Sequence, residues 1–219
     1  MSRTANFKKL LDSRIAVLDG AMGTMIQRHK LGEEDYRGEQ LKDVKQLLKG
    51  NNDLLNITRP QIIQEIHEAY LEAGADIIET NTFNGTRVSQ SDYELEDYVY
   101  EINLKAAQIA KKAADKYSAL NPEKPRFVAG AMGPTNKTAS MSPEVTDPGF
   151  RNITFDQLKA DYHEQAKALV DGGADILLVE TIFDTLNAKA ALFAISDLIK
   201  ETGQNIPVMV SGTITDASG

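Results

Sequence analysis

Three carboxylates follow short aliphatic runs in this sequence. Asp19 closes the run IAVLD, Glu79 lies in IIETN, and Glu180 comes directly after ILLV. If these runs are parallel strands, their carboxyl ends meet at one end of the fold, where α/β barrels place their chemistry. A single Asp or Glu more often caps a helix or faces water. Glu180, however, follows a run that should be buried, so a cationic partner is expected beside it.

The turn LDGAMGT, residues 18–24, combines Asp19 with two glycines that let main-chain N–H groups approach a ligand closely. Such a turn suits an anion such as a carboxylate. Alone it equally fits a plain tight turn, and it contains neither the dinucleotide fingerprint nor the phosphate loop with its lysine. Together with Glu180 it predicts acceptors for an ammonium beside donors for a carboxylate. That combination matches a free amino acid.

Metal-binding and thiol chemistry have few candidates. The chain has no cysteine and three histidines. His67 and His163 are expected on the outer faces of helices and His29 in a basic stretch, so no pair has ligand spacing. We therefore predict no metal site and no catalytic residue within these residues. Asp76 and Asp175 occupy Gly-Ala-Asp turns before strands, and we expect them only to stabilise the fold.

Short aliphatic runs alternate with helical patterns along the chain. Five strands are predicted, at Ile15–Asp19, Ile77–Asn81, Phe127–Ala131, Ile176–Thr181 and Val208–Thr213. Four helices are predicted between them, at Pro60–Ala73, Glu101–Leu120, from a Thr154 cap to Gly172, and at Thr185–Glu201 with Asp184 as cap. The similar segments EAGADIIETNTF and DGGADILLVETIFD indicate a repeated αβ unit.

These repeats favour an α/β fold of the (β/α)8 TIM-barrel type over a doubly wound sheet, because polar and glycine-rich ends follow every strand. Only the first five strands and four helices of such a barrel can be counted. We expect residues 1–219 to form its N-terminal part, truncated before strands six to eight. Working positions then include Glu79–Asn81, Glu180, Thr181 and Thr213–Asp216. The long segment Asn136–Thr154 is expected to be a loop at this end.

Composition limits the possible partners. The chain has 219 residues and a formal charge of −8, with 24 Lys and Arg scattered among 32 Asp and Glu. No basic stripe suggests nucleic acid, no apolar run is long enough for a membrane, and no secretory leader is apparent. The sequence predicts a cytoplasmic protein.

Six segments together resemble the N-terminal, homocysteine-binding domain of cobalamin-dependent methionine synthases, members of the homocysteine S-methyltransferase family. They are LDGAMGTMIQ, GNNDLLNITRP, GADIIETNTFN, GAMGPTNKTASMSPEVTDPGFRNITFD, ETIFDTLNAKAA and VSGTITDASG. The DG start and the Glu-Thr strand end are shared by the wider family. The stretch from GPTNKTAS to RNITFD resembles the cobalamin-dependent type.

The resemblance implies methyl transfer from methylcobalamin to zinc-bound homocysteine, with cobalamin and methyltetrahydrofolate modules in the same polypeptide. Three cysteine ligands for zinc are expected beyond Gly219. Carried onto this sequence, Asp19 and Glu180 would hold the homocysteine ammonium, and main-chain N–H groups around Gly20 and Ala21 would receive its carboxylate. Additional candidates, placed by position, are Glu79, Asn81 and Thr213.

Two alternatives remain open at this point. A homocysteine methyltransferase with another donor, such as betaine or S-methylmethionine, would share the pocket of Asp19 and Glu180. A purely ligand-binding or inert fragment is also compatible with five strands and no cysteine.

Overall fold

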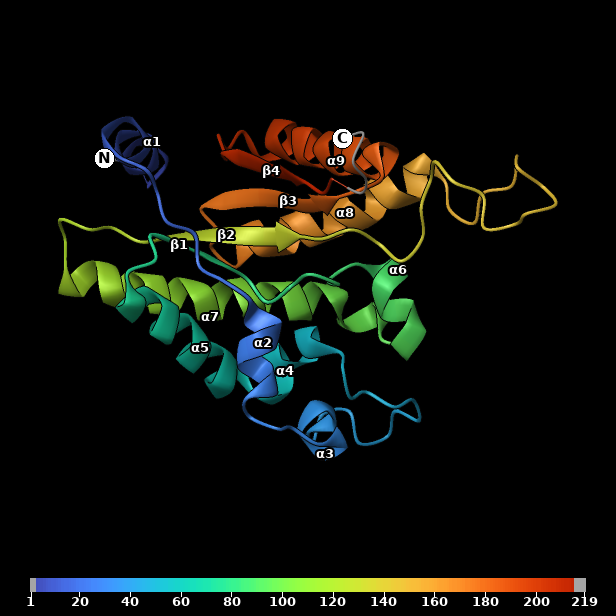
Figure 1. Ribbon diagram of the computed structural model, residues 1–219, viewed down its shortest axis with the longest axis horizontal. Coiled ribbons are helices and arrows are strands. Elements are labelled where there is room, and N and C mark those ends of the chain that lie inside the picture. The colour runs from blue at the N-terminus through green and yellow to red at the C-terminus, as the bar shows by residue number, and fades with distance from the viewer. Residues whose placement is uncertain (1–2, 215–219) are drawn as a thin grey trace.

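A four-stranded parallel sheet forms the centre of the computed structural model, which describes residues 3–214 (Figure 1). The strands are β1 (Ile77–Glu79), β2 (Phe127–Met132), β3 (Ile176–Ile182) and β4 (Val208–Gly212), and they lie side by side in chain order. A doubly wound sheet reverses its strand order at a switch point. The sequential order observed here is therefore compatible with part of a (β/α) barrel.

One long helix precedes the first strand and three connect consecutive strands, and their positions agree with the predicted ones. They are α5 (Pro60–Ala73), α7 (Val99–Leu120), α8 (Phe155–Asp171) and α9 (Thr185–Thr202). The predicted caps are confirmed, because Thr154 and Gln157 form a capping box and Asp184 accepts hydrogen bonds from two N–H groups of α9. No helix in the described part of the chain is long and apolar enough to cross a membrane.

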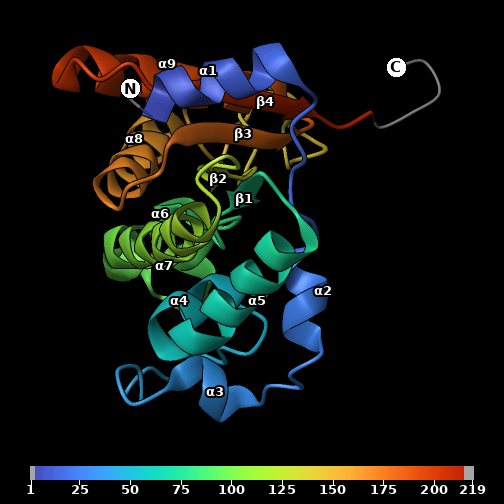
Figure 2. The same ribbon diagram turned by 90° about the vertical axis from the view of Figure 1, so that its left-hand side faces the viewer.

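The two faces of the sheet have different coverings. Side chains alternate along β3, so Leu177 and Val179 pack outward against α8 and α9, whereas Ile176 and Leu178 face inward. The inner face packs against Phe7 of α1 (Arg3–Ser13), a helix that the sequence analysis did not predict. Figure 2 shows α1 on the opposite side of the sheet from α7.

The first predicted strand was wrong in extent. Residues 15–19 form one isolated parallel bridge, between Leu18 and Ile77, rather than a strand of the sheet. Val17 and Asp19 exchange main-chain hydrogen bonds with the start of β1. Only Val17 and Asp19 bond along the start of β1, and Ile15 before them is 88% exposed.

The predicted helix count was also too low. Among the described residues the chain forms α1 and four short helices in addition, namely α2 (Met22–Gln27), α3 (Glu33–Arg37), α4 (Leu55–Thr58) and α6 (Arg87–Gln90). These helices of four to six residues have too few turns to show a helical hydrophobic period. The segment between β2 and α8 contains no helix or strand, as predicted, and Figure 1 shows it extending away from the body.

Ion pairs close the end of the sheet where the strands begin. Arg14 donates two hydrogen bonds, of 2.7 and 2.6 Å, to the buried carboxylate of Asp76, and Arg3 donates to Asp175. Hydrogen bonding to Arg14 and to the Val17 N–H holds the pKa of Asp76 below its ordinary value, although burial opposes this shift. Both aspartates lie at the strand starts, as predicted.

His67 was predicted on an outer, solvated face, and this prediction was wrong. Its side chain is fully buried on α5. Neither ring nitrogen has a hydrogen-bond partner within the described chain, and burial lowers the pKa of the imidazole to about 4. The sequence could not show which neighbouring helix covers this part of α5, and in the structure α5 packs against α7.

We expect His67→Leu to stabilise the protein. Burying unpaired polar atoms costs roughly 1 to 3 kcal/mol, and leucine removes that cost. The folded-state pKa of His67 lies below its ordinary value of about 6.5. The stability that the neutral imidazole contributes to the wild type should therefore be fully present above pH 6.5 and should be lost as the pH falls towards 4. The gain measured by urea unfolding should therefore be larger at pH 5 than at pH 7.

His163→Leu is the matched control, because His163 is partly exposed on α8 and contacts Glu201. It should change the unfolding free energy by no more than about 0.5 kcal/mol. A loss of stability in His67→Leu at both pH values would contradict the burial of an unpaired imidazole.

Candidate functional site

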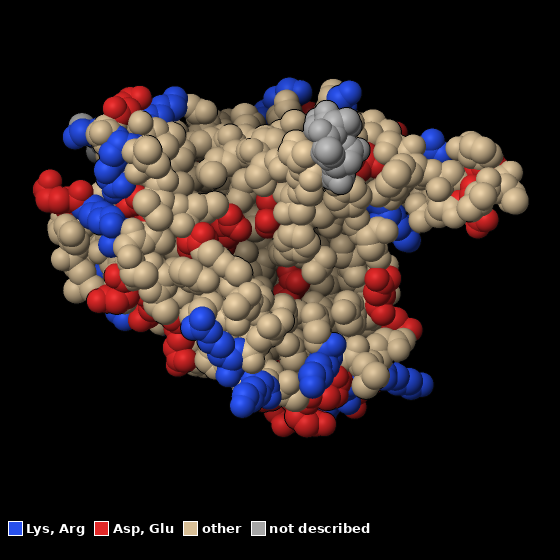
Figure 3. Space-filling model, viewed as in Figure 1, with Lys and Arg blue, Asp and Glu red and all other residues tan. Residues whose placement is uncertain are grey.

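A cavity of about 470 Å³ opens at the carboxyl ends of β1 and β3. Figure 3 shows a hollow in this face of the molecule with acidic atoms inside it. The residues that line the cavity come from three loops and from the ends of the two strands: Asp19, Gly20, Ala21, Met22, Gly23, Gly50, Asn52, Asp53, Glu79, Thr80, Asn81, Thr82, Phe83, Asn84 and Glu180.

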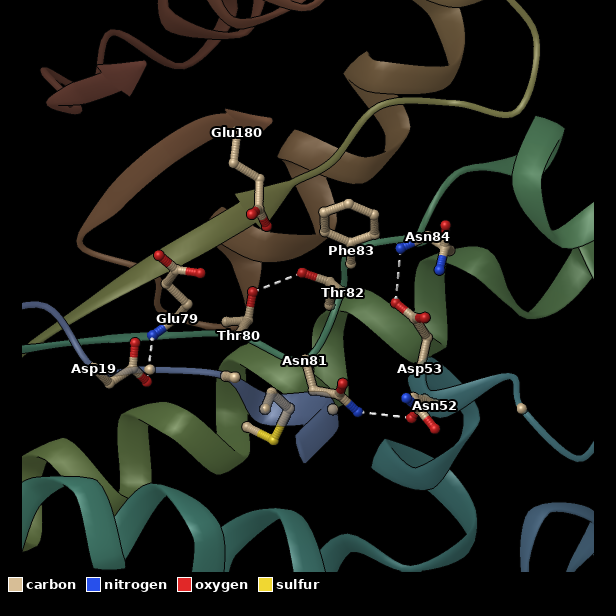
Figure 4. Close-up of a pocket in the computed structure, with 15 residues that line it drawn as sticks. Asp19, Asn52, Asp53, Glu79, Thr80, Asn81, Thr82, Phe83, Asn84 and Glu180 are labelled. Atoms are coloured by element: carbon tan, nitrogen blue, oxygen red, sulfur yellow. Dashed lines mark hydrogen bonds between the residues drawn. The ribbon is translucent and has the colours of Figure 1, made fainter. Parts of the chain in front are cut away.

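The three carboxylates predicted to converge all line this cavity. The Asp19 N–H donates to the Ile77 carbonyl at 2.9 Å, and the Asp19 side chain accepts the Glu79 N–H at 3.1 Å. The aligned backbones therefore place Asp19 beside Glu79. Glu180 reaches the cavity from the end of β3, and Figure 4 shows Glu79 and Glu180 directing their carboxyl groups into the same space.

The cavity is electrostatically uncompensated. Burial, together with the charges of Glu79 and Glu180, raises the pKa of Asp19 to about 8. Burial and the charge of Glu79 raise the pKa of Glu180 to about 7, and burial raises the pKa of Glu79. No Lys or Arg is among the described residues that line the cavity, so no cationic side chain of the described lining accompanies Glu180, and its expected cationic partner stays a prediction. The charge is left for a ligand to balance.

Gly20 and Ala21 also lie at the cavity wall, as the glycine turn predicted. A Cβ on Gly20 would lie 3.2 Å from the Tyr70 hydroxyl oxygen, which is tighter than most real contacts. Glycine therefore allows the turn to approach α5 closely. Ala21 immediately precedes α2.

The structure places the two predicted site residues Asn81 and Thr213 differently. Asn81 lines the cavity, but its amide donates to the Asn52 carbonyl at 2.7 Å and to the Asn56 side chain at 3.4 Å. It therefore supports the wall. Thr213 does not line the cavity, and its N–H donates to the Ile182 carbonyl at 2.8 Å. Asp216, at the end of the predicted working segment, lies outside the described residues.

Asp53 is a cavity residue that the sequence analysis missed. Its side chain is 1% exposed and accepts the Asn84 N–H at 3.1 Å. Burial raises its pKa to about 7. It belongs to the segment GNNDLL, which the resemblance contained, but it follows no strand and so gave no positional signal.

No group of three or more His, Cys, Asp or Glu side chains in residues 3–214 has the arrangement needed to hold a metal ion. His67 is enclosed in the core, whereas His163 pairs with Glu201 on the outer helices. The described residues thus do not fit the zinc that the resemblance implied.

We expect Asp19→Asn to stabilise the ligand-free protein at pH 8. Because the folded-state pKa of Asp19 is raised from 3.8 to about 8, ionisation should remove stability as the pH rises through this interval. Asparagine can still accept the Glu79 N–H but never ionises. The gain should be about 1 to 2 kcal/mol at pH 8 and should vanish near pH 4, as measured by urea unfolding.

Asp97→Asn is the control for this charge effect, since the Asp97 side chain is 94% exposed on the surface. Its stability difference from wild type should remain small across the pH range. An Asp19→Asn protein less stable than wild type at pH 8 would mean that Asp19 is not held in an unfavourable ionised state.

Comparisons with known proteins agree with this fold. Residues 16–219 match the sequence model described as homocysteine S-methyltransferase. Two crystal structures of the homocysteine methyltransferase MmuM from Escherichia coli are similar at 24% identity over 96% of this chain. The metallated form has a TM-score of 0.70 and is covered over 67% of its chain, and the oxidized form has 0.71 and 66%. The chain thus spans about two thirds of their length. Since the family match covers nearly the whole sequence, the chain belongs to the homocysteine S-methyltransferase family.

Proposed function

We propose that the acidic cavity binds homocysteine and that the chain is the homocysteine-binding part of a methionine synthase. The observation that carries the proposal is the cluster of Asp19, Glu79 and Glu180 in a cavity whose described lining has no Lys or Arg. An ammonium group would offset part of the negative charge of this cluster and favour the ionised carboxylates. Asp19 and Glu180 then hold the ammonium, with Glu79 beside them.

The opposite end of the ligand is assigned to the glycine turn. Main-chain N–H groups around Gly20 and Ala21 receive the homocysteine carboxylate, because this wall of the cavity presents main chain rather than acidic side chains. Held at both ends of its amino-acid moiety, homocysteine directs its thiol into the remaining space. Asn81 supports this wall, and Thr213 has no direct contact in the proposal.

The methyl donor in the proposal is methylcobalamin, with cobalamin and methyltetrahydrofolate modules as partners in a longer polypeptide. Its support is the resemblance of the stretch from GPTNKTAS to RNITFD, residues 133–156. Ser140 and Ala139 anchor the base of this segment to Asp184 and Asn187 at the start of α9. These contacts hold the segment at the end of the sheet where the cavity opens, and the proposal assigns it to face the methyl donor. S-Methylmethionine or betaine is the alternative donor, with the same homocysteine pocket.

The residues of this chain bind and orient the substrate in this proposal. A free thiol with a pKa near ~8.5 is only a few percent ionised at neutral pH, and zinc coordination would supply the thiolate. The described residues do not form that zinc site, so a non-catalytic, purely binding role for these 219 residues remains the second candidate. The sequential parallel strands support assigning residues 1–219 to the N-terminal part of a (β/α)8 barrel.

Glu180→Gln should weaken homocysteine binding with little loss of folding. Removing one charge-assisted hydrogen bond costs roughly 1.5 to 3 kcal/mol, or about one to two decades in affinity. Calorimetric titration of wild type with 4-mercaptobutanoate, which lacks the ammonium, should show a comparable loss. The two losses should not add, because they remove the same contact.

The exposed-site variant Asp97→Asn should bind homocysteine as wild type does. Equal affinity of wild type for homocysteine and for the ammonium-free thiol would remove the carboxylate cluster from substrate recognition and leave the family membership unchanged.

The 219-residue chain should retain no stoichiometric zinc after dialysis. Tight zinc sites need three or four well-placed ligands, and the chain has no cysteine and three histidines that lie far apart in the sequence. Metal analysis by mass spectrometry should find well under one equivalent. One equivalent of zinc that survives dialysis, and is lost in His67→Leu or His163→Leu, would show that a site has been misplaced.

A further inference from the structure

A tight turn of four residues after β1 forms one wall of the cavity. The Gly85 N–H donates to the Thr82 carbonyl at 3.0 Å, which closes a β-turn. Thr82 and the two central residues, Phe83 and Asn84, line the cavity (Figure 4). The Asn84 N–H donates to the buried carboxyl group of Asp53 at 3.1 Å. The position of the turn therefore decides where Phe83 and this partner of Asp53 lie.

Two buried side-chain amides hold the ends of this turn. Gln165 of α8 donates to the Thr82 carbonyl at 3.0 Å, and Asn103 of α7 donates to the Gly85 carbonyl at 2.7 Å. Both amide side chains are fully buried, in the helix layer outside the sheet. The first and last carbonyl groups of the turn are thus bonded to two different helices.

A third amide joins the turn to the loop that carries Asp53. Gln90 of α6 donates to the Asn84 carbonyl at 3.0 Å and accepts a hydrogen bond of 2.7 Å from the Asn51 amide. The Gln90 and Asn51 side chains are both buried. Because Asn51 lies two residues before Asp53, the turn and this carboxyl group share one support.

The turn is also packed too closely to shift without displacing its neighbours. A Cβ on Gly85 would lie 2.5 Å from Asn103 Oδ1 and 2.8 Å from Gln165 Nε2. On another side, a Cβ on Gly133, directly after β2, would overlap the Phe83 carbonyl oxygen. Both glycines therefore allow main chain to approach closely. The turn is held between the amides of the helices and the end of β2.

The Gln165 amide is held in one orientation at a cost. Its Nε2 also donates to Asn103 Oδ1 at 3.3 Å and to the Ala131 carbonyl at 3.4 Å, whereas its buried Oε1 finds no donor among residues 3–214. A buried acceptor without a donor is unfavourable. The reverse orientation would place the oxygen against the Thr82 carbonyl. The contact with the turn therefore outweighs the unpaired Oε1.

We infer that the three amides, Gln90, Asn103 and Gln165, are positioning residues that hold the turn as a fixed wall of the substrate cavity. None of them is among the described residues that line the cavity, so they act through the turn rather than by contact with a ligand. A wall that is ordered beforehand lowers the cost of binding. Their effect on homocysteine rests on the proposed function, whereas their effect on the hydrogen bond between Asn84 and Asp53 does not.

Gln165→Met in the 219-residue chain tests the inference. Methionine keeps the length of the side chain but has no donor. The two main-chain acceptors keep other partners, the Gly85 N–H for the Thr82 carbonyl and the Thr82 hydroxyl for the Ala131 carbonyl. Because the unpaired Oε1 also disappears, the variant should fold as wild type does. Homocysteine affinity in calorimetric titration should fall about three- to tenfold, since the turn must then be ordered when the ligand binds.

Gly85→Ala is a second variant, which removes no donor. Its Cβ would displace the turn from Asn103 and Gln165, so the affinity should fall by a similar factor. Gln64→Met is the matched control for the loss of an amide. The Gln64 amide donates to Glu68 at 2.8 Å on the same helix, outside the cavity lining, and this variant should bind homocysteine as wild type does.

A second readout follows the Asp53 carboxyl carbon by 13C NMR during a pH titration without ligand. Burial raises the pKa of Asp53 to about 7, and the hydrogen bond from the Asn84 N–H opposes this shift. Loss of that bond in Gln165→Met or Gly85→Ala should therefore raise the pKa above its wild-type value. A general loosening of the loop would admit water and lower it instead. Gln64→Met should leave the titration unchanged.

Two outcomes would overturn the inference: a homocysteine affinity of Gln165→Met equal to that of wild type, or an Asp53 pKa that is unchanged or lowered in both variants. Wild-type protein that fails to bind homocysteine would reject the proposed function alone. The NMR titration would still decide whether the amides hold the turn against Asp53.

Discussion

A cluster of buried carboxyl groups with no cationic side chain in its described lining, at one end of a parallel sheet, is the constraint around which this structure is arranged. Asp19, Glu79, Glu180 and Asp53 share a cavity whose described lining contains no Lys or Arg, and burial raises the pKa of each. Ionisation of these groups destabilises the empty site, and a cationic ligand relieves that cost. The cavity therefore combines a cost in stability with a preference for an ammonium group.

The same residue types have the opposite role at the other end of the sheet. There Asp76 is paired with Arg14, and Asp175 with Arg3, so each carboxylate is compensated within the chain. The difference is in the partners rather than in the carboxylates. One end of the strands is tied together by ion pairs, and the other keeps its charge available. This division between a stabilising end and a working end is typical of α/β barrels.

Neutral hydrogen bonds hold the charged cavity in shape. Thr80 and Thr82 bond to each other and to the main chain of Ala131, which fixes the loop after β1 to the end of β2. Asn81 bonds to the loop that carries Asp53. Because these side chains satisfy one another, the carboxylates have few partners left and must face the open space. Such a site is preorganised for a ligand that is small and positively charged at one end.

The sequence by itself determined the long helices, most of the strands and the carboxylates at the carboxyl ends of the strands. Caps such as Thr154 and Asp184, the helical period of α5, and aliphatic runs ending in carboxylates depend on neighbours within a few residues, so they could be predicted. Asp19, Glu79 and Glu180 were found because parallel strands bring their ends together.

Tertiary structure alone decided the burial of His67, the entry of Asp53 into the cavity and the left-handed bulge at Thr181. Each of these depends on packing between segments distant in sequence: α7 against α5, the loop near Asn84 against Asp53, and β4 against β3. No local pattern records such contacts, because propensity and periodicity describe a segment and not what packs against it.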